Sequence, residues 1–347
     1  MRTYPCTCGN TLYFDNTQCL RCGSAVGWCP ECSAIAPLVP GQTDGAWQCG
    51  QCGAVLALCH NYAVEAVCNR CVPVGAAGGL CDCCVHNEVI PDLSVEGHRE
   101  RWAELEGAKR RVFHSLDLLG LPRGRPGEDG LLPLTFDFKA DALPDAGLWR
   151  PTAGDEKVYT GHAGGKITIN VKEADTVERE KLRVDLNESH RTLIGHFRHE
   201  IGHYYWEVLV RNRDEARSVQ MFGDHENPSY ADALERYYAE GPRPDWPGNY
   251  ISAYASMHPW EDFAETFAHY LDMVSVLDTA IHLGLTSAPP REDLDAQLEA
   301  FRVLGLALNE LNREMGLLDL VPEVPSPAVV EKLRYVHGLC MGSNGQD

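Results

Sequence analysis

The pentapeptide His199–His203, which reads H-E-x-x-H, constrains this chain most, because its chemistry requires it to lie on a helix. Residues four apart on a helix lie on one face, so both imidazoles can reach a single metal ion. Glu200 lies one step round the helix, where its carboxylate can contact a water on the metal without being a ligand. The apolar residues nearby recur at mostly three- and four-residue steps, as one buried helix face requires, namely Leu193, Ile194, Phe197, Ile201, Tyr204 and Leu209.

A zinc ion held by two or three protein ligands keeps a position open for water and lowers the pKa of that water to about 7. The pattern therefore predicts that His199 and His203 bind zinc and that Glu200 acts as the general base. Gly202 within the motif costs roughly 1 kcal/mol of helix propensity relative to Ala, which suggests close packing beneath the metal. Because the pentapeptide also occurs by chance on ordinary buried helices, a third ligand has to be found elsewhere.

The best source of a third ligand is the stretch from Ser252 to Glu265, in which Pro259 is a favourable first residue for a helix. On that helix Glu261 and Glu265 are one turn apart and share a face. Glu261 is predicted to be the third zinc ligand and Glu265 to orient a ligand histidine from behind. Tyr254 could donate its phenol proton to the oxyanion that forms when water attacks a carbonyl.

Each of these residues also has a simpler interpretation. Glu261 could be a solvated acid favoured by the helix dipole, and Tyr254 could be a packed aromatic side chain. Five other histidines are rival ligands, although such residues are more often ordinary surface or core histidines: His162, His190, His196, His258 and His269.

Composition narrows the class of protein. A length of 347 residues with 44% apolar residues allows one large or two modest domains with a sizeable core. The net charge of −20 argues against general binding to nucleic-acid phosphates. No run of about 18 apolar residues predicts a membrane span, and the first residues lack the apolar core of a signal peptide. We therefore expect a cytoplasmic protein that contacts no membrane.

Cysteines are the second strong signal, because fourteen of the 15 lie between Cys6 and Cys84 and only Cys340 lies elsewhere. In a cytoplasmic protein such cysteines indicate metal sites before disulfides. Two successive cysteine pairs with this spacing are typical of a zinc ribbon, in which four thiolates bind one zinc ion. We predict two such structural sites, the first formed by Cys6, Cys8, Cys19 and Cys22, and the second by Cys29, Cys32, Cys49 and Cys52.

A third group of six cysteines leaves the choice of ligands open. We favour a third structural zinc site formed by Cys59, Cys68, Cys81 and Cys84, which ends in a C-x-x-C pair. Cys71, Cys83 and His60 are the alternatives. A segment with few large apolar residues cannot build much core, so zinc would supply its folding energy. Recognition of a partner is the other interpretation, and residues 1–95 hold three Arg against seven carboxylates, which excludes a basic nucleic-acid footprint.

The change in cysteine content predicts a Cys-rich zinc-ribbon region at residues 1–92 and a second domain at residues 93–347. Helices are predicted at 98–120, 292–318 and 328–338 and within 173–190, with a strand in 131–138, whereas 211–250 reads as polar and irregular. Two β-rich runs around Gly164-Gly165 predict a hairpin. Its second strand is expected to be an edge strand that pairs with an extended peptide, through Gly165, Lys166, Ile167 and Thr168.

Three long strings of residues give the chain a family resemblance over nearly its whole length: Gly161–Asn170, Arg191–Trp206 and His258–Leu271. They resemble bacterial zinc-binding metallopeptidases that carry an N-terminal zinc ribbon. The resemblance implies a gluzincin-like site. The E-x-F-A-E pattern at Glu261–Glu265 is similar to that in the catalytic domain of anthrax lethal factor, where the first Glu ligates zinc and a Tyr seven residues earlier assists the oxyanion. Tyr254 stands at that offset from Glu261.

These observations together predict an α+β, zincin-like metallopeptidase with a mostly helical catalytic domain, a small edge sheet, one catalytic zinc ion and about three structural ones. Its expected partner is a protein or peptide substrate. One alternative keeps the metal and makes the protein an isopeptidase or amidohydrolase that removes a peptide tag. Another makes it a zinc-ribbon adaptor with a latent or inactive zincin domain, in which Cys71 or Cys83 could occupy the open zinc position. The oligomeric state stays undetermined.

Overall fold

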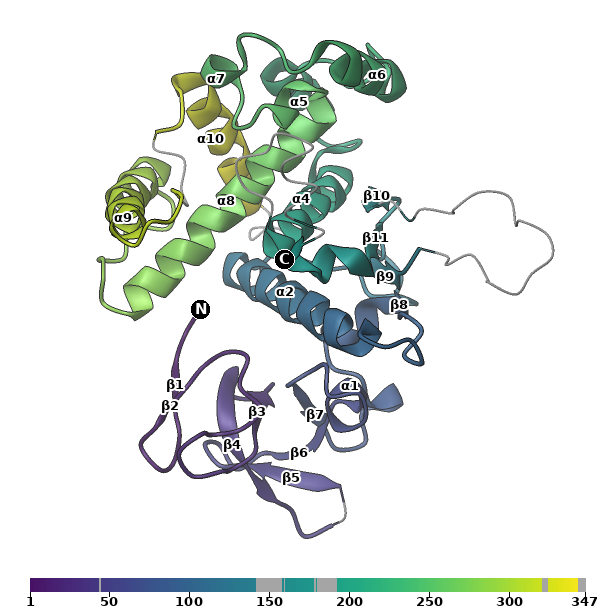
Figure 1. Ribbon diagram of the computed structural model, residues 1–347, viewed down its shortest axis with the longest axis vertical. Helices are drawn as coiled ribbons and strands as arrows, with labels where there is room; N and C mark the ends of the chain where they lie inside the picture. Colours follow the sequence, from purple (N-terminus) through teal and green to yellow (C-terminus); the bar gives the residue numbers. More distant parts are fainter. Residues whose placement is uncertain are drawn as a thin grey trace, which may run out of the picture.

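The computed structural model describes residues 1–43, 45–141, 158, 160–177, 179, 192–319 and 324–342. Figure 1 shows a Cys-rich region of short strands at one end and a larger helical body with a small sheet on one side. This mixed arrangement of helices and strands is the predicted α+β class. Residue 190 and most of the predicted helix within 173–190 lie outside the described residues.

The Cys-rich region consists of a two-stranded hairpin and an antiparallel sheet of five strands in sequence order. The hairpin joins β1 (Tyr4–Pro5) to β2 (Thr11–Leu12). The larger sheet contains β3 (Val26–Cys29), β4 (Ala34–Pro40), β5 (Ala46–Cys49), β6 (Val55–Leu58) and β7 (Cys71–Pro73). Short helical turns complete the region at α1 (His60–Ala63), η1 (Ala77–Gly79) and η2 (Cys84–His86).

The body begins with the long helix α2 (His98–Leu119), which ends at Gly120 with a positive φ of 68°, as predicted. A four-stranded sheet packs near it in the order β10-β11-β9-β8. Its strands are β8 (Asn87–Val89), β9 (Thr135–Lys139), β10 (Gly161–Ala163) and β11 (Lys166–Asn170). The predicted hairpin is confirmed, because β10 and β11 are antiparallel and joined at Gly164-Gly165.

The predicted edge strand was assigned to the wrong half of this hairpin. β11 pairs with β10 on one side and with β9 on the other over the whole of Lys166–Asn170. The strands at the two edges of the sheet are β10, the other half of the hairpin, and β8. The local sequence predicts the hairpin itself. It does not predict that the distant strand β9 pairs with the second hairpin strand, β11, because the order of strands in a sheet depends on contacts between distant segments.

The rest of the body is helical: η3 (Val171–Ala174), α4 (Leu193–Tyr205), η4 (Trp206–Val210), α5 (Glu215–Phe222), α6 (Tyr230–Glu240), α7 (Trp246–Asn249), η5 (Tyr254–Ser256), α8 (Pro259–His282), α9 (Leu294–Glu314) and α10 (Pro327–Gly342). The predicted helices near 98–120, 292–318 and 328–338 are all present. Residues 211–250 were wrongly expected to be irregular. Three of their prolines lie between the helices α5, α6 and α7, and Pro247 lies in the first turn of α7, where a helix tolerates proline.

Helices α4 and α8 cross at close range, and Gly202 is the reason that they can. A Cβ atom at Gly202 would lie 2.8 Å from the Cα and 2.9 Å from the carbonyl oxygen of Ala264 in α8. Tyr205 of α4 stacks on Phe267 of α8 with ring centroids 5.2 Å apart. The glycine within the H-E-x-x-H motif therefore brings the two motif-bearing helices together.

The main core does not stop at the predicted boundary near residue 92. Buried side chains from the third cysteine group, such as Cys68 and Cys84, belong to the same apolar cluster as Trp102 and Leu105 of α2. The first two cysteine groups lie in two separate small clusters. The third group is thus built into the body, whereas the first two form smaller units of their own.

Candidate functional site

Helices α4 and α8 bring His199, His203 and Glu261 together. The two Nε2 atoms lie 3.1 Å apart. Oε2 of Glu261 lies 2.9 Å from Nε2 of His199 and 3.4 Å from Nε2 of His203. Three potential ligand atoms therefore converge on one point, although His199 and Glu261 are 62 positions apart in the sequence.

Local sequence explains how each helix presents its residues. Thr192 caps α4, because its Oγ1 accepts a hydrogen bond from the N–H of Gly195 at 3.0 Å. His258 caps α8 in the same way, because its Nδ1 accepts from the N–H of Trp260 at 3.1 Å. Pro259 occupies the first turn of α8, so Glu261 points from the start of that helix.

The three ligand atoms fit a zinc ion. Bonds of about 2.0–2.2 Å to a tetrahedral zinc place neighbouring ligand atoms roughly 3.3–3.6 Å apart. The observed separations of 2.9, 3.1 and 3.4 Å approach such a triangle. Two imidazoles and one carboxylate are also the donor set that catalytic zinc sites use, with a fourth position left for water.

Glu265 lies behind His199, one helical turn after Glu261. Its Oε1 accepts from Nδ1 of His199 at 2.6 Å, which leaves the Nε2 lone pair free for a metal. The hydroxyl of Ser252 donates to the other oxygen of Glu265 at 2.7 Å. The sequence analysis missed Ser252, although its place two residues before Tyr254 in the same stretch was available as a signal.

The charges in the site are strongly coupled. Burial alone would raise the pKa of Glu261, but the imidazoles of His203 and His199 outweigh burial and hold that pKa well below its ordinary value. Burial alone would lower the pKa of His199, but Glu261 and Glu265 raise it well above its ordinary value. The pairing of imidazoles with carboxylates therefore stabilises the charged form of Glu261 inside the buried site.

Glu200 is buried beside the two histidines, with 8% of its surface exposed. Its Oε2 atom has no hydrogen-bond partner among the described residues. Burial raises the pKa of Glu200, and the neighbouring imidazoles of His199 and His203 partly oppose this rise. A buried carboxylate with one oxygen left unpartnered is suited to exchange a proton with a bound molecule.

Tyr254 lies in the short turn η5 before α8, with its ring centroid 6.0 Å from that of His199. Burial raises the pKa of its phenol, and Glu261 raises it further. The phenol therefore stays protonated and able to donate at neutral pH.

The rival histidines have other roles in the described structure. His258 caps α8, His269 packs against Phe301 with ring centroids 5.9 Å apart, and Nδ1 of His196 lies 3.1 Å from a Glu173 carboxylate oxygen. His162 lies close to the candidate site without joining it. Its ring centroid is 6.2 Å from that of His203, and its Nε2 accepts a hydrogen bond from the N–H of Gly165. His190 lies outside the described residues.

The residues predicted to bind substrate lie at the turn and on β11. Gly165 is close-packed, since a Cβ there would lie 2.1 Å from the carbonyl oxygen of Pro133. Lys166 pairs with Glu88 at 2.8 Å, and Ile167 is fully buried. Because β11 is paired on both sides, these residues and Thr168 offer no free strand edge to a peptide.

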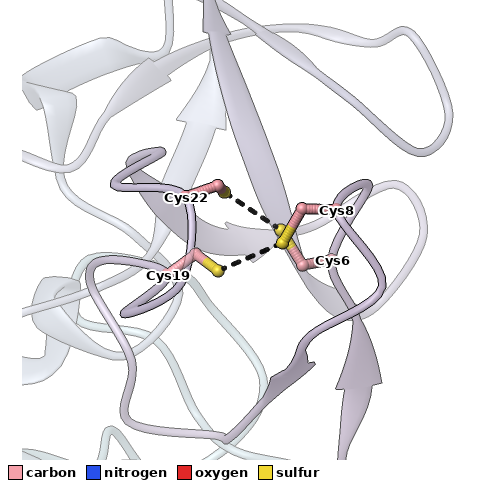
Figure 2. Close-up of side chains that lie close together, drawn as sticks. All are labelled: Cys6, Cys8, Cys19 and Cys22. Atoms are coloured by element: carbon pink, nitrogen blue, oxygen red, sulfur yellow. Dashed lines mark hydrogen bonds between the residues drawn. The ribbon is translucent and has the colours of Figure 1, made fainter.

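The structure also groups the cysteines into three sets of four whose sulfur atoms all lie within 4.8 Å of one another. Figure 2 shows the first set, in which Cys6 and Cys8 face Cys19 and Cys22 from two loops. Sγ–Sγ distances are 3.7 Å for Cys6–Cys22 and for Cys8–Cys19. Bonds of about 2.3 Å to a tetrahedral zinc require sulfur atoms roughly 3.8 Å apart, so the set fits zinc.

The other two sets have the same geometry. Sγ–Sγ distances are 3.7 Å for Cys29–Cys52, 3.8 Å for Cys32–Cys49 and 3.8 Å for Cys68–Cys81. The third set is formed by the residues favoured from the sequence, Cys59, Cys68, Cys81 and Cys84, and all four are buried.

Cys71 and Cys83 stand apart from these sets. Cys71 is buried in the small cluster that contains Cys29 and Cys49. Cys83 is buried with the third set. A thiol enclosed in either position would need the Cys-rich region to open before it could reach His199, so the geometry does not support a cysteine plug.

Two family models match the chain and together span most of it. One, described as "Putative zinc-binding metallo-peptidase", matches residues 98–339. The chain belongs to this metallopeptidase family. The other, a zinc-ribbon domain, matches residues 3–95. The family resemblance inferred from the sequence is therefore confirmed. Both the zinc-binding family and the three four-cysteine sets are consistent with zinc as the metal.

The curated relatives match almost the whole chain, and their names state no activity. Uncharacterised proteins of Mycobacterium bovis and of two strains of Mycobacterium tuberculosis are each 39% identical over 349 residues, covering 97% of this chain and 94% of the relative. No solved structure matches the chain. Among the described residues, no helix is both long enough and apolar enough to cross a membrane.

Proposed function

We propose that this protein is a zinc-dependent peptidase that hydrolyses peptide bonds, with His199, His203 and Glu261 as zinc ligands and Glu200 as general base. The observation that carries the proposal is the convergence of the three ligand atoms beside a buried carboxylate oxygen of Glu200 that has no hydrogen-bond partner in the described part of the chain. Zinc held there would activate water and polarise the carbonyl of a bound peptide. The remaining steps belong to the protein's own side chains.

Glu200 takes a proton from the attacking water at its unpartnered oxygen, which the raised pKa of this buried carboxyl favours. It then gives that proton to the departing amine. Tyr254, kept protonated by its raised pKa, donates to the carbonyl oxygen as negative charge develops there. Glu265 keeps the proton of His199 on Nδ1 and so keeps Nε2 directed at the metal.

The test combines metal content with cleavage of an unfolded protein. Wild type is expected to hold about four zinc ions, and His199→Ala/His203→Ala about three, with cleavage lost. Glu200→Gln should keep all the zinc and lose cleavage by at least about 100-fold, the range of one general base. His196→Gln is the control on the same helix, because His196 contacts Glu173 and is neither a predicted ligand nor the base, so this variant should keep all the zinc and retain cleavage.

An unchanged zinc content in the double histidine variant would refute the metal assignment. Cleavage that survives Glu200→Gln would refute the role of this residue as the base.

A further inference from the structure

Tyr230 reaches the candidate zinc site from a helix that no sequence motif connected with it. Its hydroxyl donates a hydrogen bond to Oε1 of Glu261 at 2.8 Å. The ring lies against His258 and Trp260, with centroids 5.3 and 5.9 Å away. Tyr230 thus contacts a candidate zinc ligand directly.

The helix that carries Tyr230 makes its contacts with the body near the same site. Tyr230 is the first residue of α6, after the cap residue Ser229. Tyr237, two turns later, packs on Tyr254 with ring centroids 5.8 Å apart. Arg236 donates to the carbonyl oxygen of Met257, close to the start of α8. Figure 1 shows α6 at the outer end of the body, beyond α5.

The two oxygens of Glu261 have different partners. Oε2 faces the two histidines at 2.9 and 3.4 Å, whereas Oε1 accepts the hydrogen bond of Tyr230. A carboxylate that offers one oxygen to zinc leaves a position open, whereas one that offers both raises the coordination number. With Glu261 buried at 2% exposure, Oε1 would have to find another partner if Tyr230 could not donate.

We propose that Tyr230 is a positioning residue that holds Glu261 as a one-oxygen ligand. This inference rests on the proposed zinc peptidase function and adds a second aromatic hydroxyl, beside that of Tyr254, to the site. Tyr230 acts through Glu261 and takes no proton itself. The residue is 37% exposed, so Tyr230→Phe removes the hydroxyl without opening a buried cavity.

The experiment uses the full-length protein, in which the catalytic zinc has been exchanged for Co²⁺ while the structural zinc is retained and counted. The visible spectrum of Co²⁺ reports coordination number, because four-coordinate cobalt absorbs more strongly than five-coordinate cobalt. Wild type, Tyr230→Phe and Tyr238→Phe are compared. Tyr238 is the matched control, because it lies on the same helix with its side chain 68% exposed.

Tyr230→Phe is expected to weaken the cobalt absorption, as the freed Oε1 joins the metal, and to lower metal affinity in chelator competition by roughly 10- to 100-fold. On a peptide that the wild type cleaves, kcat should fall by a similar factor while KM changes less than about twofold, because the lost interactions serve the transition state. Tyr238→Phe should leave the spectrum, the affinity and kcat at the wild-type values.

A Tyr230→Phe spectrum and affinity equal to those of the wild type would overturn the inference while leaving the proposed function intact. A wild type that binds no cobalt beyond its cysteine sites would overturn the proposed function, and the inference with it. Circular dichroism and the structural zinc count verify that each variant is folded.

Discussion

Loss of a single ligand should have very different effects at the third cysteine set and at the second. Cys84 is fully buried in the main core, whereas Cys52 is exposed at the edge of a small cluster. We expect Cys84→Ser to lower the thermal stability of the body and Cys52→Ser to release one zinc ion with little effect on the body. Both changes replace one sulfur by one oxygen, so they form a matched pair.

The difference follows from the charges around the third set. Three buried cations surround it, Arg70, Lys109 and Arg110, exposed by 2%, 0% and 6%. A zinc ion with four thiolates carries two net negative charges, and buried Glu106, paired with Lys109 at 2.9 Å, adds a third. Burial would lower the pKa of Lys109, but Glu106 and the Cys84 thiolate raise it. Arg70 is paired with Asp82 at 2.8 Å, so the zinc–thiolate cluster is needed chiefly as the counter-charge of Arg110.

A cluster that loses its zinc ion and its thiolate charge leaves the buried guanidinium of Arg110 without a counter-charge. Removing one partner of a buried ion pair costs about 3–5 kcal/mol. A domain has only about 5–15 kcal/mol of stability in total. At roughly 2–4 °C per kcal/mol, the midpoint of thermal unfolding should fall by more than about 6 °C.

Calorimetry on both variants, with zinc counted before and after, tests this reasoning. Cys52→Ser should lose one zinc ion and keep the main transition within a few degrees of the wild type. The charge argument would be refuted by a Cys84→Ser protein that lacks one zinc ion and still unfolds at the wild-type temperature. Equal shifts in the two variants would also refute it.

Two further predictions concern the body. Gly202→Ala would place a Cβ 2.8 Å from Ala264, so we expect a loss of about 1–3 kcal/mol in denaturant unfolding and weaker zinc binding as α4 moves from α8. Burial lowers the pKa of His86 to about 4, so the unfolded chain binds one more proton between that value and about 6.5. Stability should therefore decrease as pH falls through this window, by up to about 1.4 kcal/mol per pH unit, and His86→Asn, which can still donate to the Leu134 carbonyl, should show a shallower dependence.

The parts that the sequence predicted well depend on local spacing. The four-residue step of His199 and His203, and that of Glu261 and Glu265, fixes which residues share a helix face before any tertiary contact forms. The knuckle spacing Cys81-x-x-Cys84 similarly selects one pair of thiols from several. Each of these patterns carries its own geometry, so the structure could be anticipated from a few residues.

The parts that were missed depend on contacts between distant segments. Tyr230 lies 31 positions before Glu261, in a segment rich in polar residues and prolines. The two residues are in contact only because the chain places the start of α6 next to the start of α8. The pairing of β9 with β11, which moved the free edge to β10, joins strands separated by a long connection. No local pattern of residues specifies either contact.

The N-terminal residues link the Cys-rich region to the helix that carries Glu261. Arg2 pairs with Asp278 of α8 at 2.9 Å, and the N–H of Thr3 donates to His282 at 3.0 Å. Arg110 of α2 donates to the carbonyl oxygen of Val67 of the Cys-rich region at 2.8 Å. The Cys-rich region is thus attached both to α2 and to α8, and both helices pack against α4. Because the third set and the helix of His199 share one core, zinc in that set would stabilise the core on which the candidate site is built, which argues against a purely accessory role for it.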